Sequence, residues 1–294
     1  MLFIDRPRPD APTGIYGVRI NGGEVQLVSE RVGEFSPDGR YLLSVNARSQ
    51  PIIYDLVSGG TTVIRNKGRG VIFSPNSQRL AWSYVQEAQV FSERRSTITV
   101  ADPDGENARE VATVIGSGLA GWLDDDHLLL IGREEGDPRD EEGLFSLSVV
   151  DGSRVDLARR SRVHSVMPAP GGEWACYVAA LDPDDPTQNG LWVVKADASQ
   201  YYRVDLFGGV QWRDATHLLI IPMEINAPSH WLVQFDVTTG MLTPLTDPAR
   251  FPFRIFAGEW RVSPTGHYVV FVSAEDQALW AFDLPPLESS SPSE

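Results

Sequence analysis

Serine, histidine and acidic side chains are the groups of this 294-residue chain that could perform hydrolytic catalysis. The serine nucleophile of an α/β-hydrolase lies in a Gly-x-Ser-x-Gly turn between a strand and a helix. The segment Gly116-Ser117-Gly118 has only half of that spacing and stands in a connection between apolar runs. We therefore expect no catalytic serine of this class, and the sequence favours a protein without enzymatic activity.

The histidines divide into two groups. Three of the five follow a turn at the start of an apolar run: His127, His217 and His267. We interpret these three as turn residues. The fold that this sequence predicts is a ring of repeated units, in which the first strand of each unit lies innermost, along a central channel. His164 stands near the start of one such innermost strand, and Arg31 and Arg69 stand at similar places. Guanidinium groups match carboxylates and phosphates, so these three residues at the mouth of a central channel could bind an anionic ligand; the alternative is that they pair with nearby acids.

Two acidic segments contain oxygen ligands of the kind that calcium prefers. The segment 102–107 resembles the start of a calcium loop, but its twelfth position is Thr113 instead of glutamate. The three consecutive side chains of Asp124–Asp126 diverge within a tight turn. Cys176 is the only cysteine, which excludes an intrachain disulfide and a cysteine-based zinc site. We expect no metal ion and no other cofactor.

Several loops that join second to third strands are long, and two of them are acidic. The acids are Glu134, Glu135, Asp137, Asp140, Glu141 and Glu142 in one loop and Asp182, Asp184 and Asp185 in another. Phe91, in a third loop, adds an apolar group that could anchor a partner. Binding residues concentrate on loops that a rigid frame supports. We therefore predict a protein or peptide partner at this face, basic by charge complementarity; a solvated charge run is the alternative.

Six segments repeat one pattern, in which a turn precedes a short apolar run. The equivalent turn positions are Pro37, Pro75, Asp124, Pro170, Asp214 and Pro264, which lie 38, 49, 46, 44 and 50 residues apart. Proline presets φ, aspartate caps its own backbone and glycine accepts a positive φ, so these segments predict tight turns between strands. A period of about 45 residues is typical of propeller blades.

Each repeat continues into a third strand that ends at or near an acidic residue. The predicted third strands are 52–54, 97–100, 144–150, 191–194, 231–235 and 279–282. No long amphipathic helix interrupts the series. The sequence therefore predicts an all-β fold, a β-propeller built from four-stranded antiparallel blades.

Two of the turn segments carry a family resemblance. Phe35–Arg40 reads Phe-Ser-Pro-Asp-Gly-Arg, and 73–76 reads Phe-Ser-Pro-Asn. These signatures resemble the WD-repeat-like blades of TolB-type propellers and of the propeller domains of some peptidases. The resemblance implies the fold and leaves the function open, because this fold supports scaffolds, receptors and enzymes. The alternatives to a binding scaffold are a lyase- or glycosidase-type enzyme with a site at the channel mouth, and the accessory propeller of a larger peptidase-like protein.

The number of blades depends on the N-terminal segment. Residues 15–20 and 25–28 form a further hairpin around Asn21-Gly22-Gly23, and residues 2–5 resemble a second strand. We expect seven blades, the first incomplete; six blades closed by an N-terminal strand are the alternative. Residues 1–284 then form a single propeller domain, and the Ser- and Pro-rich residues 285–294 a disordered tail.

Composition excludes several classes of protein. With 25 basic and 40 acidic residues, the net charge is −15. This charge argues against nucleic-acid binding, because a protein that binds nucleic acid needs a basic face. No run reaches the roughly 18 apolar residues of a membrane helix, so we expect no membrane insertion. The N-terminus lacks the apolar core of a secretory signal. We expect a monomer that is cytoplasmic, provided that no upstream segment is missing.

Overall fold

The computed structural model describes residues 2–5, 10–64, 69–86, 88–90, 93–137, 142–158, 163–180, 186–224 and 227–287. Within these residues, the strands pair in antiparallel fashion, and a short 3-10 turn, η2, spans Pro186–Gln188. The predicted all-β class is confirmed. In the same part of the chain, no helix is long and apolar enough to cross a membrane.

The chain divides into two compact units, unit 1 (Met1–Arg159) and unit 2 (Arg160–Glu294). Unit 1 contains β1 (Leu2–Asp5), β2 (Gly14–Gly17), β3 (Gln26–Ser29), β4 (Glu34–Phe35), β5 (Tyr41–Val45), β6 (Pro51–Asp55), β7 (Thr61–Val63), β8 (Arg69–Phe73), β9 (Leu80–Gln86), β10 (Arg95–Ala101), β11 (Arg109–Trp122), β12 (His127–Arg133), β13 (Gly143–Ser148) and β14 (Arg154–Ala158). Unit 2 contains β15 (Val163–Pro168), β16 (Trp174–Ala179), β17 (Gly190–Lys195), β18 (Tyr201–Val204), β19 (Gly208–Trp212), β20 (His217–Pro222), β21 (Val233–Asp236), β22 (Met241–Pro244), β23 (Ile255–Val262), β24 (Tyr268–Ser273) and β25 (Leu279–Asp283).

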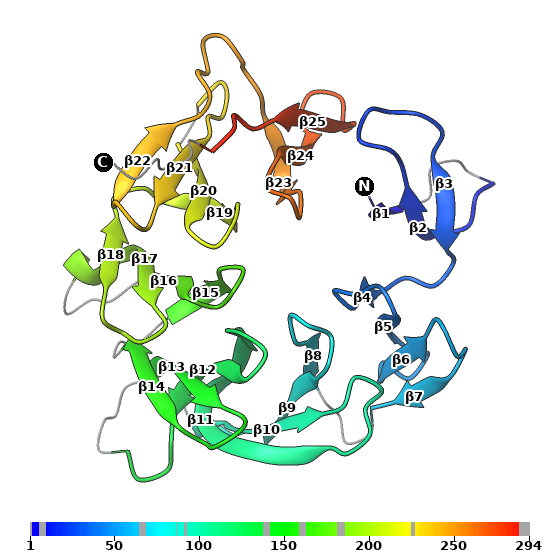
Figure 1. The fold of residues 1–294 in the computed structure, drawn as a ribbon, viewed down its shortest axis with the longest axis vertical. Coiled ribbons are helices and arrows are strands. Elements are labelled where there is room, and N and C mark those ends of the chain that lie inside the picture. The colour runs from blue at the N-terminus through cyan, green and yellow to red at the C-terminus, as the bar shows by residue number, and fades with distance from the viewer. Residues whose placement is uncertain are drawn as a thin grey trace, which may run out of the picture. The chain divides into compact units, whose positions relative to one another are not determined.

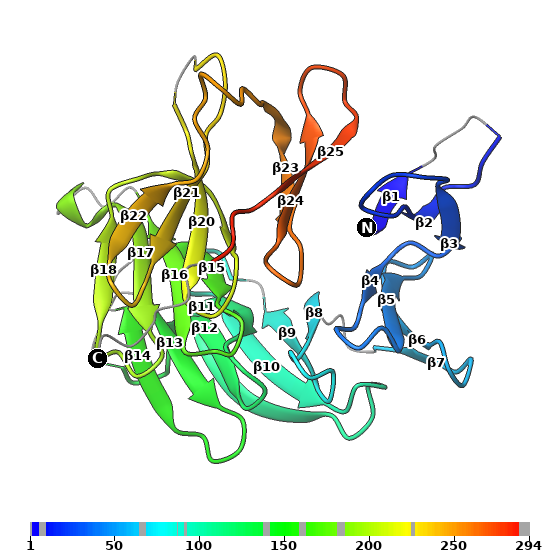
Figure 2. The ribbon, with the colours of Figure 1, turned by 45° about the horizontal axis from the view of Figure 1, so that its top comes forward.

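The strands of each sheet follow one another side by side in chain order (Figure 1). Four-stranded sheets are formed by β4–β7, β15–β18 and β19–β22, and three-stranded sheets by β1–β3 and β23–β25. The remaining sheet has seven strands, β8–β14, because the long strand β11 pairs with β10 through its first half and with β12 through its second (Figure 2). These described strands thus form seven successive meanders; the number of blades stays a prediction.

The repeated Ser-Pro segments form the turn between the first and second strands. In the first of them, the Ser36 hydroxyl donates to Asp38 Oδ1 (2.6 Å) and accepts from the backbone N–H of Tyr41 (2.9 Å). Ser74 accepts from the N–H of Arg79 in the same way (3.0 Å). A side chain that satisfies the backbone of a turn makes that turn a reproducible local unit, which explains why the pattern recurs.

The acidic residues predicted at the ends of third strands cap the next turn. Asp55, Asp151, Asp197 and Asp236 each accept a hydrogen bond from the backbone N–H two residues later. The N–H and hydroxyl of Ser153 lower the pKa of Asp151 to about 2. These Asx turns favour the charged carboxylate and fix the path between the third and fourth strands.

The core lies between neighbouring meanders. In unit 2, one buried cluster joins Trp174 and Cys176 of β16 to Leu218 and Ile220 of β20. Strand β16 is buried along its whole length, since both of its faces are covered. Burial raises the pKa of the Cys176 thiol to about 12, so this cysteine acts as a small apolar core residue.

Tryptophans of the innermost strands connect adjacent meanders within each unit. In unit 1, Trp122 Nε1 donates to the carbonyl of Ile72 (3.4 Å). In unit 2, Trp212 Nε1 donates to the carbonyl of Met167 (3.0 Å). In each case a large buried ring contacts the preceding innermost strand and satisfies its own polar group there. These contacts join successive meanders within each unit.

Candidate functional site

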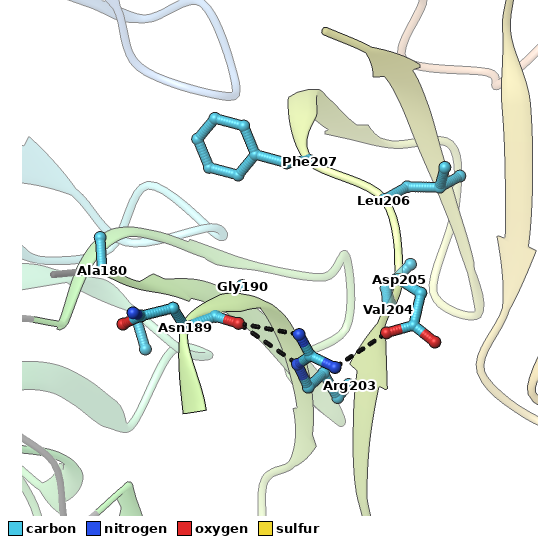
Figure 3. Close-up of a pocket in the computed structure, with 9 residues that line it drawn as sticks. Ala180, Asn189, Gly190, Arg203, Val204, Asp205, Leu206 and Phe207 are labelled. Atoms are coloured by element: carbon cyan, nitrogen blue, oxygen red, sulfur yellow. Dashed lines mark hydrogen bonds and ion pairs between the residues drawn. The ribbon is translucent and has the colours of Figure 1, made fainter. Parts of the chain in front are cut away.

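Unit 2 contains a pocket of about 450 Å³ between the ends of three strands. Ala179 and Ala180 come from the end of β16, Asn189 and Gly190 from the start of β17, and residues 203–207 from the end of β18 and the connection that follows (Figure 3). The space exists because three of these residues are alanine or glycine. It lies at the end of the sheet where the loop between β16 and β17 emerges.

Arg203 forms one wall of this pocket. Its Nε and Nη2 both donate to the carbonyl of Asn189 (3.2 Å each), and its Nη1 donates to Asp205 (2.9 Å). Gly190 has a φ of +142°, a conformation that residues with side chains rarely adopt, and a Cβ there would be in ordinary van der Waals contact with Arg203 Nε, 3.4 Å away. The guanidinium thus ties β17 to the segment after β18 and gives the pocket a defined polar side (Figure 3).

Apolar side chains border the opposite side of the pocket. Phe207 projects on the side of Ala180 (Figure 3) and is 52% exposed. Its carbonyl accepts from the N–H of Met223 (2.8 Å), whose side chain is 68% exposed. Phenylalanine and methionine are both enriched in protein interfaces, where their large apolar side chains contact the partner. We call Phe207 and Met223 the apolar rim.

The loop that follows Met223 is fastened to the next meander of unit 2. The backbone N–H of His230 donates to the carbonyl of Phe253 (2.7 Å), and His230 Nδ1 accepts from the N–H of Ile255 (3.1 Å). Burial first, and the neighbouring Arg254 second, lower the pKa of His230. The imidazole is therefore held neutral, with Nδ1 as its acceptor.

Three innermost strands, β8, β15 and β23, contain a bulge near their first residues, and β11 contains one in its middle. Two of these bulges place a residue other than glycine at a positive φ, Ser165 at +52° and Ala257 at +49°. Such conformations cost about 1–3 kcal/mol and persist only where the surroundings enforce them. The bulges re-aim the side chains at the starts of these strands.

The three residues predicted at the channel mouth lie at or near the starts of β4, β8 and β15. Arg31 precedes β4, and its guanidinium lies 4.4 Å from the centre of the Tyr54 ring. Arg69 begins β8. His164 is exposed in the bulge of β15, with Nδ1 2.9 Å from Ser165 Oγ. Arg31 and Arg69 belong to unit 1 and His164 to unit 2; the anion site stays a prediction.

The acidic loop between β12 and β13 is paired with arginines of unit 1. Glu134 forms an ion pair with Arg154 of β14 (3.0 Å), and Asp137 lies 3.7 Å from the same guanidinium. Glu135 accepts two hydrogen bonds from Arg95 of β10 (2.9 and 3.0 Å), which lower the pKa of its carboxyl. Part of the negative charge predicted for this loop is therefore compensated locally.

Glu142, at the other end of the same loop, is half-buried. Its Oε2 accepts from the Ser117 hydroxyl (3.2 Å), and a Cβ on Gly116 would lie 2.7 Å from its carboxyl carbon. Burial raises the pKa of Glu142, although Ser117 and Arg133 act in the opposite direction. Ser117 thus lies beside a glutamate, in a bulge of β11.

The remaining predicted site residues lie outside the described residues: Phe91, Asp140, Glu141, Asp182, Asp184 and Asp185. The histidines expected to act in turns do so at two equivalent positions. His127 Nδ1 lies 2.9 Å from both oxygens of Asp124, and His217 Nδ1 lies 2.9 and 3.0 Å from those of Asp214. Across the described ranges, no three His, Cys, Asp or Glu side chains are grouped as metal ligands would be.

Sequence reasoning missed the pocket and its apolar rim. It predicted acids within the long loops, and it did not name residues 203–207, which lie at the end of β18 and in the short connection that follows. The available signal was Leu206-Phe207 directly before Gly208-Gly209. Leu206 packs against the core of unit 2, whereas Phe207 is exposed, and an exposed aromatic side chain in a connection between strands indicates a contact surface.

The chain matches no model of a known protein family. A search among curated proteins gives no match either.

Several solved structures are similar. An oligogalacturonate lyase of Vibrio parahaemolyticus has a TM-score of 0.65 at 13% identity, covering 98% of this chain and 86% of the lyase. The β-propeller domain of the Trilobed protease from Pyrococcus furiosus has a TM-score of 0.61 at 14% identity, covering 96% and 90%. A putative TolB from Agrobacterium tumefaciens has a TM-score of 0.50 at 15% identity, covering 92% and 97%. These likenesses show that the chain adopts a β-propeller fold.

Proposed function

We propose that the protein is a propeller scaffold that binds a protein or peptide partner at the loops joining second to third strands. The observation that carries this proposal is the pocket of about 450 Å³ in unit 2 together with its exposed apolar rim. A pocket that accepts one anchoring side chain, beside exposed apolar groups, is the usual arrangement of an interaction hot spot.

The charges near the pocket indicate the chemistry of the partner. Asp205 is largely exposed although it pairs with Arg203, and Glu224, next to Met223, is exposed. With a net charge of −15, the protein attracts basic partners over a long range. We infer a partner segment that inserts an apolar side chain between Ala180 and Phe207 and carries lysine or arginine beside it.

A phage-displayed library of random peptides tests this proposal, with the purified protein as bait. We expect enrichment of peptides that combine an apolar residue with basic neighbours. Binding of these peptides to the Phe207→Ala and Met223→Ala variants is expected to weaken about tenfold or more, because the buried apolar contact is lost.

Met241→Ala is the matched control. Met241 belongs to β22, in the sheet whose strand β20 Met223 directly follows, and is 62% exposed, but it stands opposite Asp236, at the other end of the strands. The control is expected to bind like the unmodified protein. Peptides that bind all variants equally, or a library that yields no specific peptide, would contradict the proposal.

A ligand site at the innermost strands is the competing interpretation, and His164 is the described residue that favours it. Oligogalacturonate, on which one similar structure is named as acting, serves as an anionic probe. A rise in melting temperature with this probe that His164→Ala abolishes, and Met223→Ala leaves intact, would support the competing interpretation. At 13% identity, the similarity to the lyase supports only a shared fold and gives no support for lyase activity in this chain.

A further inference from the structure

The last strand of unit 2, β25, has a neighbour on only one side. The order of its sheet is β23-β24-β25, so β25 is the edge. In the other described meanders the third strand is paired on both sides; for example, β17 lies between β16 and β18, and β21 between β20 and β22. The position that a fourth strand occupies elsewhere is therefore open beside β25 in the described part of the chain.

The pairing with β24 shows which backbone groups face that open edge. The N–H of Leu284 donates to the carbonyl of His267, and the N–H of Ser273 donates to that of Ala278. Hydrogen-bonded pairs alternate along an antiparallel ladder, so Trp280 and Phe282 bond to β24. The N–H and C=O groups of Leu279, Ala281 and Asp283 then point outward.

This edge lacks the charged residues and the proline that two other outer strands, β14 and β22, carry. Strand β14 carries Arg154 and Asp156, and β22 ends in Pro244. By contrast, β25 reads Leu-Trp-Ala-Phe before its final aspartate, and Leu279 and Trp280 are 40% and 53% exposed. Lysine, proline and charge are the usual protection against strand addition.

The charged side chains of the chain segment that contains β25 are all acidic. Glu275 and Asp276 precede the strand, Asp283 ends it, and the segment 274–287 contains no lysine or arginine. A segment that lies along β25 therefore meets acidic groups at both of its ends.

We propose that the open edge of β25 binds an extended segment of a partner polypeptide that carries basic residues at both ends. The segment adds a fourth strand through backbone hydrogen bonds at Leu279, Ala281 and Asp283, as in β-augmentation. The backbone supplies affinity, and Glu275, Asp276 and Asp283 select the basic ends. This surface differs from the pocket at residues 203–207 and does not depend on the proposed function.

The probe is a fluorescent peptide, Lys-Val-Thr-Val-Thr-Val-Lys, measured by anisotropy against the full chain. We expect saturable binding that weakens with salt, because the end charges contribute. A second peptide with N-methyl groups on alternate amides keeps the side chains but cannot form the ladder, so its affinity is expected to fall at least about tenfold.

Two variants of the protein complete the test. Ala281→Pro removes an N–H that faces the open edge, a place where a strand tolerates proline, and is expected to abolish binding. Ala281→Ser keeps the N–H and is expected to bind normally. Glu275→Gln is expected to weaken binding and to reduce its dependence on salt.

Several outcomes would overturn the proposal. These are the absence of saturable binding, equal binding of both peptides, and unchanged binding by a folded Ala281→Pro variant. If Ala281→Pro does not fold, the comparison of the two peptides decides alone. Self-association that Ala281→Pro abolishes would assign the edge to a second copy of the chain and would also overturn it.

Discussion

Arg213 is a buried cation that connects three segments of unit 2. The residue is 4% exposed. Its Nε donates to the carbonyl of Gly266 (3.0 Å), its Nη1 to Gln234 Oε1 (2.7 Å) and its Nη2 to the carbonyl of Pro285. Burial lowers the pKa of Arg213, while Asp214 acts in the opposite direction. The chain is thereby attached at Pro285, the first residue of the predicted tail.

Replacing this arginine is expected to destabilise the protein. Arg213→Ala leaves Gly266 and Gln234 without their donors, which costs about 3 kcal/mol in the free energy of unfolding. Urea denaturation measures the change. Arg250→Ala is the control, because the Arg250 side chain is 80% exposed and its loss is expected to cost little. An equal loss of stability in the two variants would show that the buried hydrogen bonds of Arg213 do not stabilise the protein.

His230 makes stability depend on pH. Its neutral ring accepts from Ile255, and its pKa in the folded protein lies below the ordinary value of 6.5. When the pH falls below about 6.5, the unfolded chain binds the proton first. Stability is therefore lost as the pH falls from 6.5 towards the folded pKa, and this group has no effect at higher pH.

The His230→Gln variant tests this dependence. Urea denaturation of both proteins between about pH 7 and pH 5 is expected to show a steeper loss for the unmodified protein, because only it carries the imidazole. The difference between the two curves isolates His230 from the carboxylates, which are common to both. Parallel curves would contradict the assignment.

At the scale of elements, the acidic loop after β12 is fastened to two strands of unit 1. Arg154 of β14 pairs with Glu134 and with Asp156 (2.7 Å), and its guanidinium lies 3.9 Å from the centre of the Phe145 ring. Its side chain is 19% exposed, whereas the Arg95–Glu135 pair is 40% and 75% exposed. The Arg154 contacts are thus better shielded from water.

Arg154→Ala is therefore expected to loosen the loop, and Arg95→Ala to change it little. We expect faster amide hydrogen exchange over residues 134–137 in Arg154→Ala, together with a loss of about 1 kcal/mol in stability. Hydrogen exchange with mass spectrometry measures the first effect and thermal melting the second. Identical exchange in the two variants would show that neither pair restrains the loop.

The turns and third strands could be predicted because their causes are local. A Ser-Pro-Asp segment closes its turn with its own side chains, and the aspartate at the end of a third strand accepts a hydrogen bond from the backbone N–H two residues later. The bulges of β15 and β23 could not be predicted, since Ser165 and Ala257 do not prefer a positive φ. Pairing with the neighbouring strand imposes those conformations.

At the scale of the whole molecule, the composition and the repeat indicate the fold class. The similar solved structures share the propeller fold at 13–15% identity. Such a fold needs only the turn chemistry and apolar strands at a regular period. The residues of the loops that join these strands can vary without changing the fold, so the fold does not reveal the partner.

Sequence alone determined where the turns lie, which runs form strands and that the surface is acidic, because these properties depend on neighbouring residues and on composition. Tertiary structure alone decided which residues meet. Glu135 is paired with Arg95, 40 residues away, and the pocket joins Ala180 to Phe207. The reason is physical: strand pairing and packing bring distant segments together, and a charge or an apolar side chain acquires its role from the partner that it meets there.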